Sequence, residues 1–158
     1  MTLLSVRNLK VHFPVKTGGL FGRVLPLKAV DGVSFDLEEG ETLGIVGESG
    51  CGKSTLGRAI LQLLPATEGT VAWLGAPVGP SRVHSLRREM QVVFQDPLAS
   101  LDPRMTAGDI IAEPLRNYHA ELGRAEITAR VQGMMTKVGL LPAMINRYPH
   151  EFSGGQCQ

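Results

Sequence analysis

Apolar and polar residues alternate along two stretches near the N-terminus, residues 3–13 (LLSVRNLKVHF) and 27–37 (LKAVDGVSFDL). Alternation of this kind, rich in β-branched and aromatic residues, is typical of strands that bury one face. The stretch between them, PVKTGGLFGRVLP, carries glycines and prolines that favour a connection. The pattern therefore predicts a long hairpin on an antiparallel layer.

Short apolar runs bounded by turn residues follow the hairpin. Residues 42–46 (TLGIV) have the composition of a buried parallel strand, and residues 91–95 (QVVFQ) predict a second apolar strand, entered from a short Arg-rich helix. Residues 69–75 (GTVAWLG) predict another strand, in which Trp73 packs in the core or the hairpin. From residue 54 to 64 the apolar positions recur at helical spacing, so a helix is expected there, stopped by Pro65.

Beyond Asp96 the chain changes to a helical pattern. The residues that recur at helical spacing are Ile127, Val131, Met134, Met135 and Val138. Pro114 and Pro142 mark helix starts or kinks. Residues 104–150 therefore predict a small helical subdomain, and Ser153 has the properties of an N-cap for one more helix after it.

Composition narrows the class of protein. Of the 158 residues 43% are hydrophobic and 20% charged, with a net charge of +1, so a globular domain is expected and no bulk field favours nucleic acid. Two cysteines cannot supply a disulfide framework, the N-terminus has no secretory pattern, and no apolar run reaches the ~18 residues that cross a bilayer. We expect a soluble, cytoplasmic protein.

The strongest chemical signal is GESGCGKST at residues 47–55, which matches the phosphate-binding pattern G-x-x-x-x-G-K-[ST]. The residues are Gly47, Glu48, Ser49, Gly50, Cys51, Gly52, Lys53, Ser54 and Thr55. Glycines let backbone N–H groups wrap a phosphate at a helix N-terminus, Lys53 would reach the β- and γ-phosphates, and the Ser54 hydroxyl would bind Mg²⁺. A chance match in a chain of this length has odds of roughly one in a few hundred. The alternative is an ordinary glycine-rich turn between strand and helix.

Two further features of the sequence add no second site. Cys51 lies in this loop near a helix start, where a thiol could have a redox role, although a small tolerated loop residue is the simpler interpretation. The four histidines show no paired spacing typical of metal ligands, so no transition-metal site is predicted.

The sequence FSGGQ at residues 152–156 resembles the LSGGQ signature of ABC-type ATPases, which follows a P-loop by about a hundred residues. Gln95, in VVFQDP, stands where that family has its Q-loop glutamine. Longer segments, including QDPLASLDPR and RYPHEFSGGQ, resemble the ATP-binding subunits of di- and oligopeptide importers. Relatives of those systems move nickel, glutathione or cell-wall peptides, and nickel or glutathione import is the less favoured expectation here.

The resemblance implies an α/β fold, the P-loop NTPase core of ABC type. Within it, residues 1–41 would form the antiparallel β layer, residues 42–103 the P-loop core to the Q-loop, and residues 104–158 the helical subdomain with the signature motif. The C-terminal part of the core would be missing from this chain.

The resemblance also implies a mechanism and partners. Two such domains would pair head to tail around two ATP molecules with Mg²⁺, and the signature residues of one would contact the γ-phosphate held by the other; these are Ser153, Gly154, Gly155 and Gln156. Lys53 and Gln95 would be catalytic, Gln95 also touching Mg²⁺ and the attacking water. Phe13 would stack on adenine, although a core phenylalanine is an equal interpretation.

The partners would be membrane permease subunits and, indirectly, a periplasmic or extracellular substrate-binding protein, with no nucleic acid. Localisation would be peripheral, on the inner face of the cell membrane.

The sequence departs from the family pattern at its end. Family members continue SGGQRQR, whereas Cys157 stands at the first Arg and Gln158 is the last residue. The Walker B carboxylates, the D-loop and the switch histidine would all follow that point, so we expect an ABC-type ATPase fragment without steady hydrolysis of its own. The alternatives are a non-catalytic nucleotide-binding or interaction module, a decayed gene product or a partial sequence; soluble ABC proteins of translation or DNA repair are disfavoured by the importer-like segments.

Overall fold

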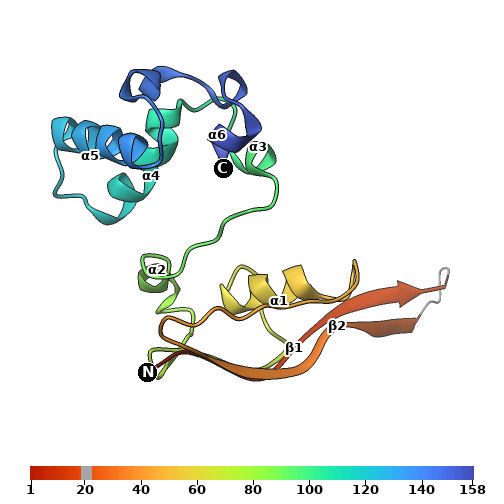
Figure 1. The fold of residues 1–158 in the computed structure, drawn as a ribbon. Coiled ribbons are helices and arrows are strands. Elements are labelled where there is room, and N and C mark those ends of the chain that lie inside the picture. The colour runs from red at the N-terminus through yellow and green to blue at the C-terminus, as the bar shows by residue number, and fades with distance from the viewer. Residues whose placement is uncertain (19–22) are drawn as a thin grey trace. The chain divides into compact units, whose positions relative to one another are not determined.

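The computed structural model of the chain describes residues 1–18 and 23–158 and divides into two compact units, Met1–Met90 and Gln91–Gln158 (Figure 1). This division follows spatial contacts. The three functional segments that the sequence predicts, 1–41, 42–103 and 104–158, stay a prediction.

The first unit is built on a four-stranded sheet in the order β2-β1-β3-β4. The strands are β1 (Thr2–Thr17), β2 (Arg23–Glu38), β3 (Glu68–Trp73) and β4 (Ala76–Pro77), and each neighbouring pair is antiparallel. The predicted hairpin is confirmed, and its strands reach farther than residues 13 and 27. Residues 19–22 of its connection lie outside the described residues.

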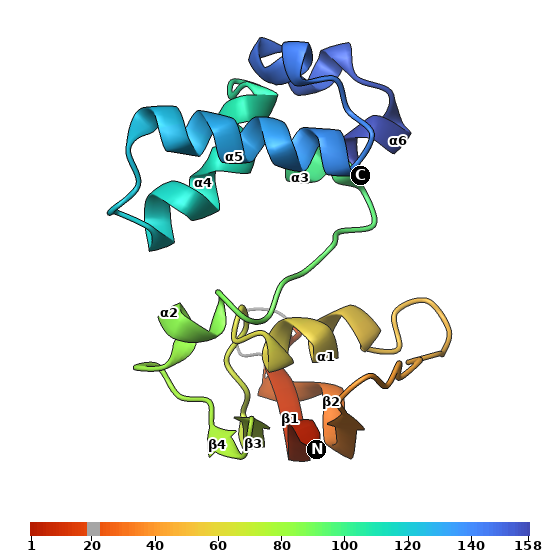
Figure 2. The ribbon, with the colours of Figure 1, turned by 60° about the vertical axis from the view of Figure 1, so that its left-hand side comes forward.

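Helix α1 (Lys53–Ile60) covers one face of this sheet (Figure 2). The core between them is formed by Leu4, Val6, Leu9, Val11, Val30, Leu56, Ala59, Ile60 and Val71. Trp73 packs against this core, as predicted, and its Nε1–H donates to Glu89 Oε2 at 2.6 Å. Burial of these alternating side chains is what holds the helix on the sheet.

Helix α1 ends at Ile60, four residues before the predicted end at residue 64. Gln62 has a left-handed backbone with φ of 55°. The N–H of Gln62 donates to the Ala59 carbonyl at 3.1 Å, and the N–H of Leu63 donates to the Arg58 carbonyl at 2.8 Å. This is the Schellman pattern of helix termination. The left-handed turn, rather than Pro65, therefore stops the helix.

Two predicted strands are absent from the structure. Residues 42–46 and 91–95 have no regular secondary structure, and neither joins the sheet of the described residues. Val46 and Val93 are 92% and 78% exposed. A strand exists only where a neighbour pairs with its N–H and C=O groups, and no described strand pairs with either segment. The short helix expected before residue 91 is present as α2 (Val83–Leu86).

The regular elements of the second unit are all helices or 3-10 turns among its described residues, so the helices expected within residues 104–150 are present. Its elements are α3 (Pro97–Ser100), α4 (Ala107–Tyr118), α5 (Arg124–Lys137), two 3-10 turns, η1 (Pro142–Asn146) and η2 (Pro149–Glu151), and α6 (Gly154–Cys157). Pro142 begins η1, whereas Pro114 lies inside α4. Within residues 1–18 and 23–158, no helix is long and apolar enough to span a bilayer.

A small core joins α4, α5 and η1. Ala112, Val131 and Met135 are its buried members. Met134 and Val138, which share the helical spacing, are instead 49% and 65% exposed. Val131 and Met135 are four residues apart and so lie on one face of α5, toward the core.

Gly108 fixes how closely α4 approaches η1. A Cβ added there would lie 2.8 Å from the Ile145 carbonyl oxygen and closer still to the Ile145 side chain. Gly133 on α5 has a helical backbone too, but no heavy atom of the described residues would lie within 4 Å of its added Cβ. Alanine at Gly108 therefore tests the close packing of α4 on η1, whereas alanine at Gly133 tests helix propensity alone.

We predict opposite effects of alanine at these two positions. Gly108→Ala should lower the free energy of unfolding by roughly 1–3 kcal/mol, because α4 must move away from η1. Gly133→Ala should raise it by about 0.5–1 kcal/mol, because alanine restricts the unfolded chain and favours helix. Urea denaturation of both variants beside the parent chain measures this. Equal stability of Gly108→Ala and the parent would contradict the close contact.

Candidate functional site

The loop of residues 47–55 runs irregularly to Gly52, and α1 begins at Lys53. Gly52 has a left-handed backbone with φ of 102°. A side chain at this position would overlap the backbone carbonyl of Ala29 on β2. Glycine is therefore required before the lysine for two reasons, the backbone conformation and the close approach of the strand.

The N-terminus of α1 has no cap from the described side chains, and its first turn contains no acidic residue. The N–H groups of Lys53, Ser54 and Thr55 accordingly lack side-chain acceptors. Helix α4 differs, because the Thr106 hydroxyl accepts from the Asp109 N–H at 3.2 Å. An uncapped helix start with its partial positive charge favours an anion.

The ammonium group of Lys53 lies within the loop itself. Its Nζ donates to the carbonyls of Gly47 at 2.8 Å and Glu48 at 2.7 Å. Cys51 Sγ lies 3.7 Å from the same nitrogen, and Cys51 is an exposed free cysteine. A positive charge is thus fixed next to the free N–H groups of the helix start, where the motif predicts phosphate oxygens.

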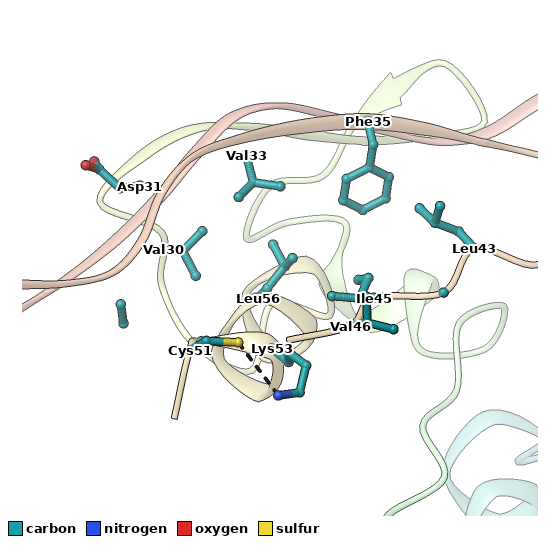
Figure 3. Close-up of a pocket in the computed structure, with 13 residues that line it drawn as sticks. Val30, Asp31, Val33, Phe35, Leu43, Ile45, Val46, Cys51, Lys53 and Leu56 are labelled. Atoms are coloured by element: carbon teal, nitrogen blue, oxygen red, sulfur yellow. Dashed lines mark hydrogen bonds between the residues drawn. The ribbon is translucent and has the colours of Figure 1, made fainter. Parts of the chain in front are cut away.

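A groove of about 510 Å³ lies beside the loop, between β2 and α1 (Figure 3). Apolar side chains point into it, namely Val30, Val33, Phe35, Leu43, Ile45 and Leu56. Asp31 stands at its rim, where Lys28 Nζ donates at 3.0 Å and His12 Nε2 lies at 3.1 Å. Hydrogen bonds from Lys28 and then from His12 hold the pKa of the Asp31 carboxyl below its ordinary value. Asp31 is therefore ionised and already bonded.

The remaining predicted residues of the phosphate site lie in different places. Ser54 is exposed in the first turn of α1, as a metal-binding hydroxyl requires. Phe13, on β1, is half-buried and packs against the core. Gln95 is exposed in the second unit, so its joint Mg²⁺ site with Ser54 stays a prediction.

The signature residues form a capped helix start. The Ser153 hydroxyl accepts from the Gln156 N–H at 3.3 Å, and Gln156 Oε1 accepts from the Ser153 N–H at 3.0 Å, which is a capping box. At Gly154 and Gly155 an added Cβ would meet no heavy atom of the described residues within 4 Å, apart from the chain neighbours and the backbone of α6 itself. Packing within this chain therefore does not require glycine at either position. Close approach of a ligand phosphate or of another backbone would require it.

Cys157, which stands where the sequence pattern has Arg, is half-buried behind the signature residues. Its Sγ donates to the Pro149 carbonyl at 3.5 Å. It also lines an apolar cavity of about 90 Å³ with Phe152 and Ile110. The thiol thus serves packing in this position.

Sequence reasoning missed Ala29, the residue whose carbonyl supports Gly52. Val11 pairs with Val30 and His12 with Lys28, so Ala29 is the extra residue of a β-bulge. The signal in the sequence is the break in alternation, since the apolar residues Ala29 and Val30 are adjacent after Leu27.

Comparisons with known proteins identify the family. The model of the family described as ABC transporter matches residues 30–158. The chain is 60% identical over 161 residues to the Escherichia coli (strain K12) oligopeptide transport ATP-binding protein OppF, across 99% of this chain and 48% of that protein. It is 48% identical to the Bacillus subtilis oligopeptide transport ATP-binding protein AppF, and 51% identical to the glutathione import ATP-binding protein GsiA of Escherichia coli O157:H7. These matches cover 99% of this chain, with 49% of AppF and 25% of GsiA. The chain spans about half the length of OppF and AppF.

A solved structure shares the fold. The dimeric post-hydrolysis state of the ATP-binding cassette MJ0796, bound to ADP and Pi, matches 98% of this chain and 65% of that one, with a TM-score of 0.78 and 27% identity. The predicted fold class, an ABC-type α/β fold with an antiparallel layer and a helical part, is thereby confirmed. With the phosphate loop at residues 47–55, the signature at 152–156 and a family match over residues 30–158, this chain belongs to the ABC transporter family.

Proposed function

We propose that residues 1–158 are the ATP-binding portion of a subunit that couples ATP to oligopeptide import. The observation that carries the proposal is the uncapped start of α1 with the Lys53 ammonium fixed beside it. The substrate class rests on the 60% identity to OppF over 99% of the chain. Import of glutathione is the second candidate, favoured by the 51% identity to GsiA.

The residues of the loop fit ATP with Mg²⁺. The free N–H groups of Lys53, Ser54 and Thr55 would bind phosphate oxygens, and the Lys53 ammonium would exchange the Gly47 and Glu48 carbonyls for the β- and γ-phosphates. Ser54, and Gln95 from the second unit, would hold the ion. Bound Mg²⁺ would neutralise charge that develops on the phosphates.

The signature residues would serve a second copy of the domain. Ser153 keeps its O–H free to donate while its oxygen accepts from Gln156, and the open backbone at Gly154 and Gly155 leaves room for a phosphate. Head-to-tail pairing would place this surface against the loop of the partner copy. The dimeric ATP-binding cassettes among the solved structures support such an arrangement.

Hydrolysis is a separate question from binding. In the described part of the chain, no group of three or more His, Cys, Asp or Glu side chains gathers as metal ligands do. Asp31, the carboxylate at the groove, is bonded to Lys28 and His12. We therefore propose that residues 1–158 by themselves are a nucleotide-binding module, and that turnover needs carboxylates from elsewhere.

We propose in addition that the subunit acts at the inner face of the membrane. It would dock on permease subunits through residues 95–118, and a periplasmic or extracellular substrate-binding protein would deliver the cargo to that permease. The support is the resemblance of this stretch to importer Q-loop segments and the relatives' role in oligopeptide transport.

Lys53→Ala should weaken binding of ATP in the presence of Mg²⁺ by roughly 10- to 100-fold, because it removes charged hydrogen bonds to the β- and γ-phosphates. Titration calorimetry on residues 1–158 measures the change. Lys137→Ala, in the last turn of α5, is the control that removes a lysine from the other unit. Equal ATP affinity of Lys53→Ala and the parent would refute the phosphate site.

Residues 1–158 should release phosphate from ATP at least ~10²-fold more slowly than full-length OppF, because Asp31, the carboxylate at the groove, is already bonded to Lys28 and His12 and is not available as a general base. A phosphate-release assay with Mg²⁺ compares the two. Turnover near that of OppF, and abolished by Lys53→Ala, would show that the catalytic groups are already present.

A cysteine at the exposed residue Arg104 should form a crosslink to the permease when the subunit and its transport complex are expressed together. The variant would carry Cys51→Ser and Cys157→Ser, so that Arg104→Cys is its one reactive thiol. Thr17→Cys, at the end of β1, is the control and should not crosslink. Permease capture from Thr17→Cys alone would contradict the proposed contact.

A further inference from the structure

A small cluster of charged side chains lies around the β-bulge at Ala29. One carboxylate oxygen of Asp31 accepts a hydrogen bond from Lys28 Nζ at 3.0 Å, and the other lies 3.1 Å from His12 Nε2. Lys28 and Asp31 stand on either side of the bulge in β2, and His12 is the residue of β1 that pairs with Lys28. We call these three side chains the bulge clamp.

The β1 side of the bulge clamp is itself anchored to the start of β3. The N–H of His12 donates to Thr67 Oγ1 at 2.9 Å, and the N–H of Thr67 donates to the Lys10 carbonyl at 2.7 Å. Lys10 Nζ donates in turn to Glu68 Oε2 at 2.7 Å. A continuous series of hydrogen bonds and ion pairs therefore runs from β3 through His12 to Asp31.

The bulge also supports the loop of residues 47–55. The Ala29 carbonyl lies against Gly52 and leaves no room for a Cβ there. The carbonyl of Gly52 accepts from the Leu56 N–H at 2.8 Å, in the first turn of α1. A displacement of the bulge would therefore move Gly52, and with it the N–H groups at the helix start.

Hydrogen bonding rather than burial keeps Asp31 in place. Figure 3 shows its carboxyl group turned away from the apolar side chains of the groove. The side chains of Lys28 and Asp31 are 57% and 44% exposed. Exposed ion pairs add little to the stability of a fold. The effect of this cluster is therefore expected on the local geometry of the bulge rather than on unfolding.

On the basis of the phosphate site proposed above, we propose that Asp31 is a positioning residue for the loop of residues 47–55. It joins the two sides of the bulge through Lys28 and fastens the bulge to β1 through His12. The Ala29 carbonyl is thereby held against Gly52. Asp31 thus acts on a bound phosphate through the backbone of Gly52, without touching the nucleotide.

The test compares ATP with inorganic triphosphate, which has the phosphates but neither ribose nor base. Calorimetry on residues 1–158 with Mg²⁺ measures both affinities. Asp31→Ala should weaken both ligands by the same factor, about three- to tenfold, because groups that share a hydrogen-bond network are coupled to this extent. Asp31→Asn should lie between Asp31→Ala and the parent, because its side-chain carbonyl still accepts a hydrogen bond.

Asp36→Ala is the matched control. Asp36 lies on the same strand with its side chain 43% exposed, and it accepts across the hairpin from Arg7 Nη2 at 2.7 Å. It pairs with Ser5, away from the bulge. This variant removes a comparable ion pair and leaves the bulge clamp intact, so it should bind both ligands as the parent does.

Hydrogen exchange of the ligand-free chain gives a second measurement that needs no phosphate. The Leu56 amide should exchange at least about threefold faster in Asp31→Ala than in the parent or in Asp36→Ala, because its acceptor, the Gly52 carbonyl, is held less firmly.

The outcomes separate this inference from the function on which it rests. Equal weakening by Asp31→Ala and Asp36→Ala would indicate a general effect on the hairpin, and weakening of ATP alone would indicate contact with the nucleoside; either result overturns the inference. Unchanged exchange at Leu56, or unchanged triphosphate affinity, overturns it as well. If the parent binds neither ligand, the proposed phosphate site fails, and the exchange at Leu56 alone decides whether the bulge clamp holds Gly52.

Discussion

The close contact between the Ala29 carbonyl and Gly52 is the constraint on which the site depends. It joins a β-bulge in the hairpin to the residue just before α1, so the sheet determines where the free N–H groups of the helix point. Any residue larger than glycine would separate loop and strand. The loop of residues 47–55 is thus held by the antiparallel layer.

Local signals in the sequence were sufficient for the features that local chemistry controls. The hairpin follows from alternation, the start of α1 from the glycine-lysine motif, and the cap of α6 from Ser153. The strands expected at residues 42–46 and 91–95 are absent, because strand pairing is not controlled by local sequence. An apolar run reveals a tendency to be buried, but a strand also needs a partner, and partners are set by contacts far along the chain.

The candidate site, too, could be predicted only where local sequence determines its geometry. Lys53 and Ser54 could be assigned from the motif, because its spacing reflects one loop conformation. Ala29 could not, since its part is played by a backbone carbonyl and carries no side-chain signature.

The hydrogen bonds from Lys53 to the Gly47 and Glu48 carbonyls bear on the energetics of binding. A glycine-rich loop has unusually high conformational entropy, and ordering it on ligand capture would oppose affinity. Here Lys53 holds the two ends of the loop together by hydrogen bonds before any ligand binds. The entropy cost of ordering the loop is therefore part of folding rather than of binding. Under the proposed function, the cation that orders the loop would also be the one that meets the phosphates, and binding would exchange hydrogen-bond acceptors instead of ordering a mobile segment.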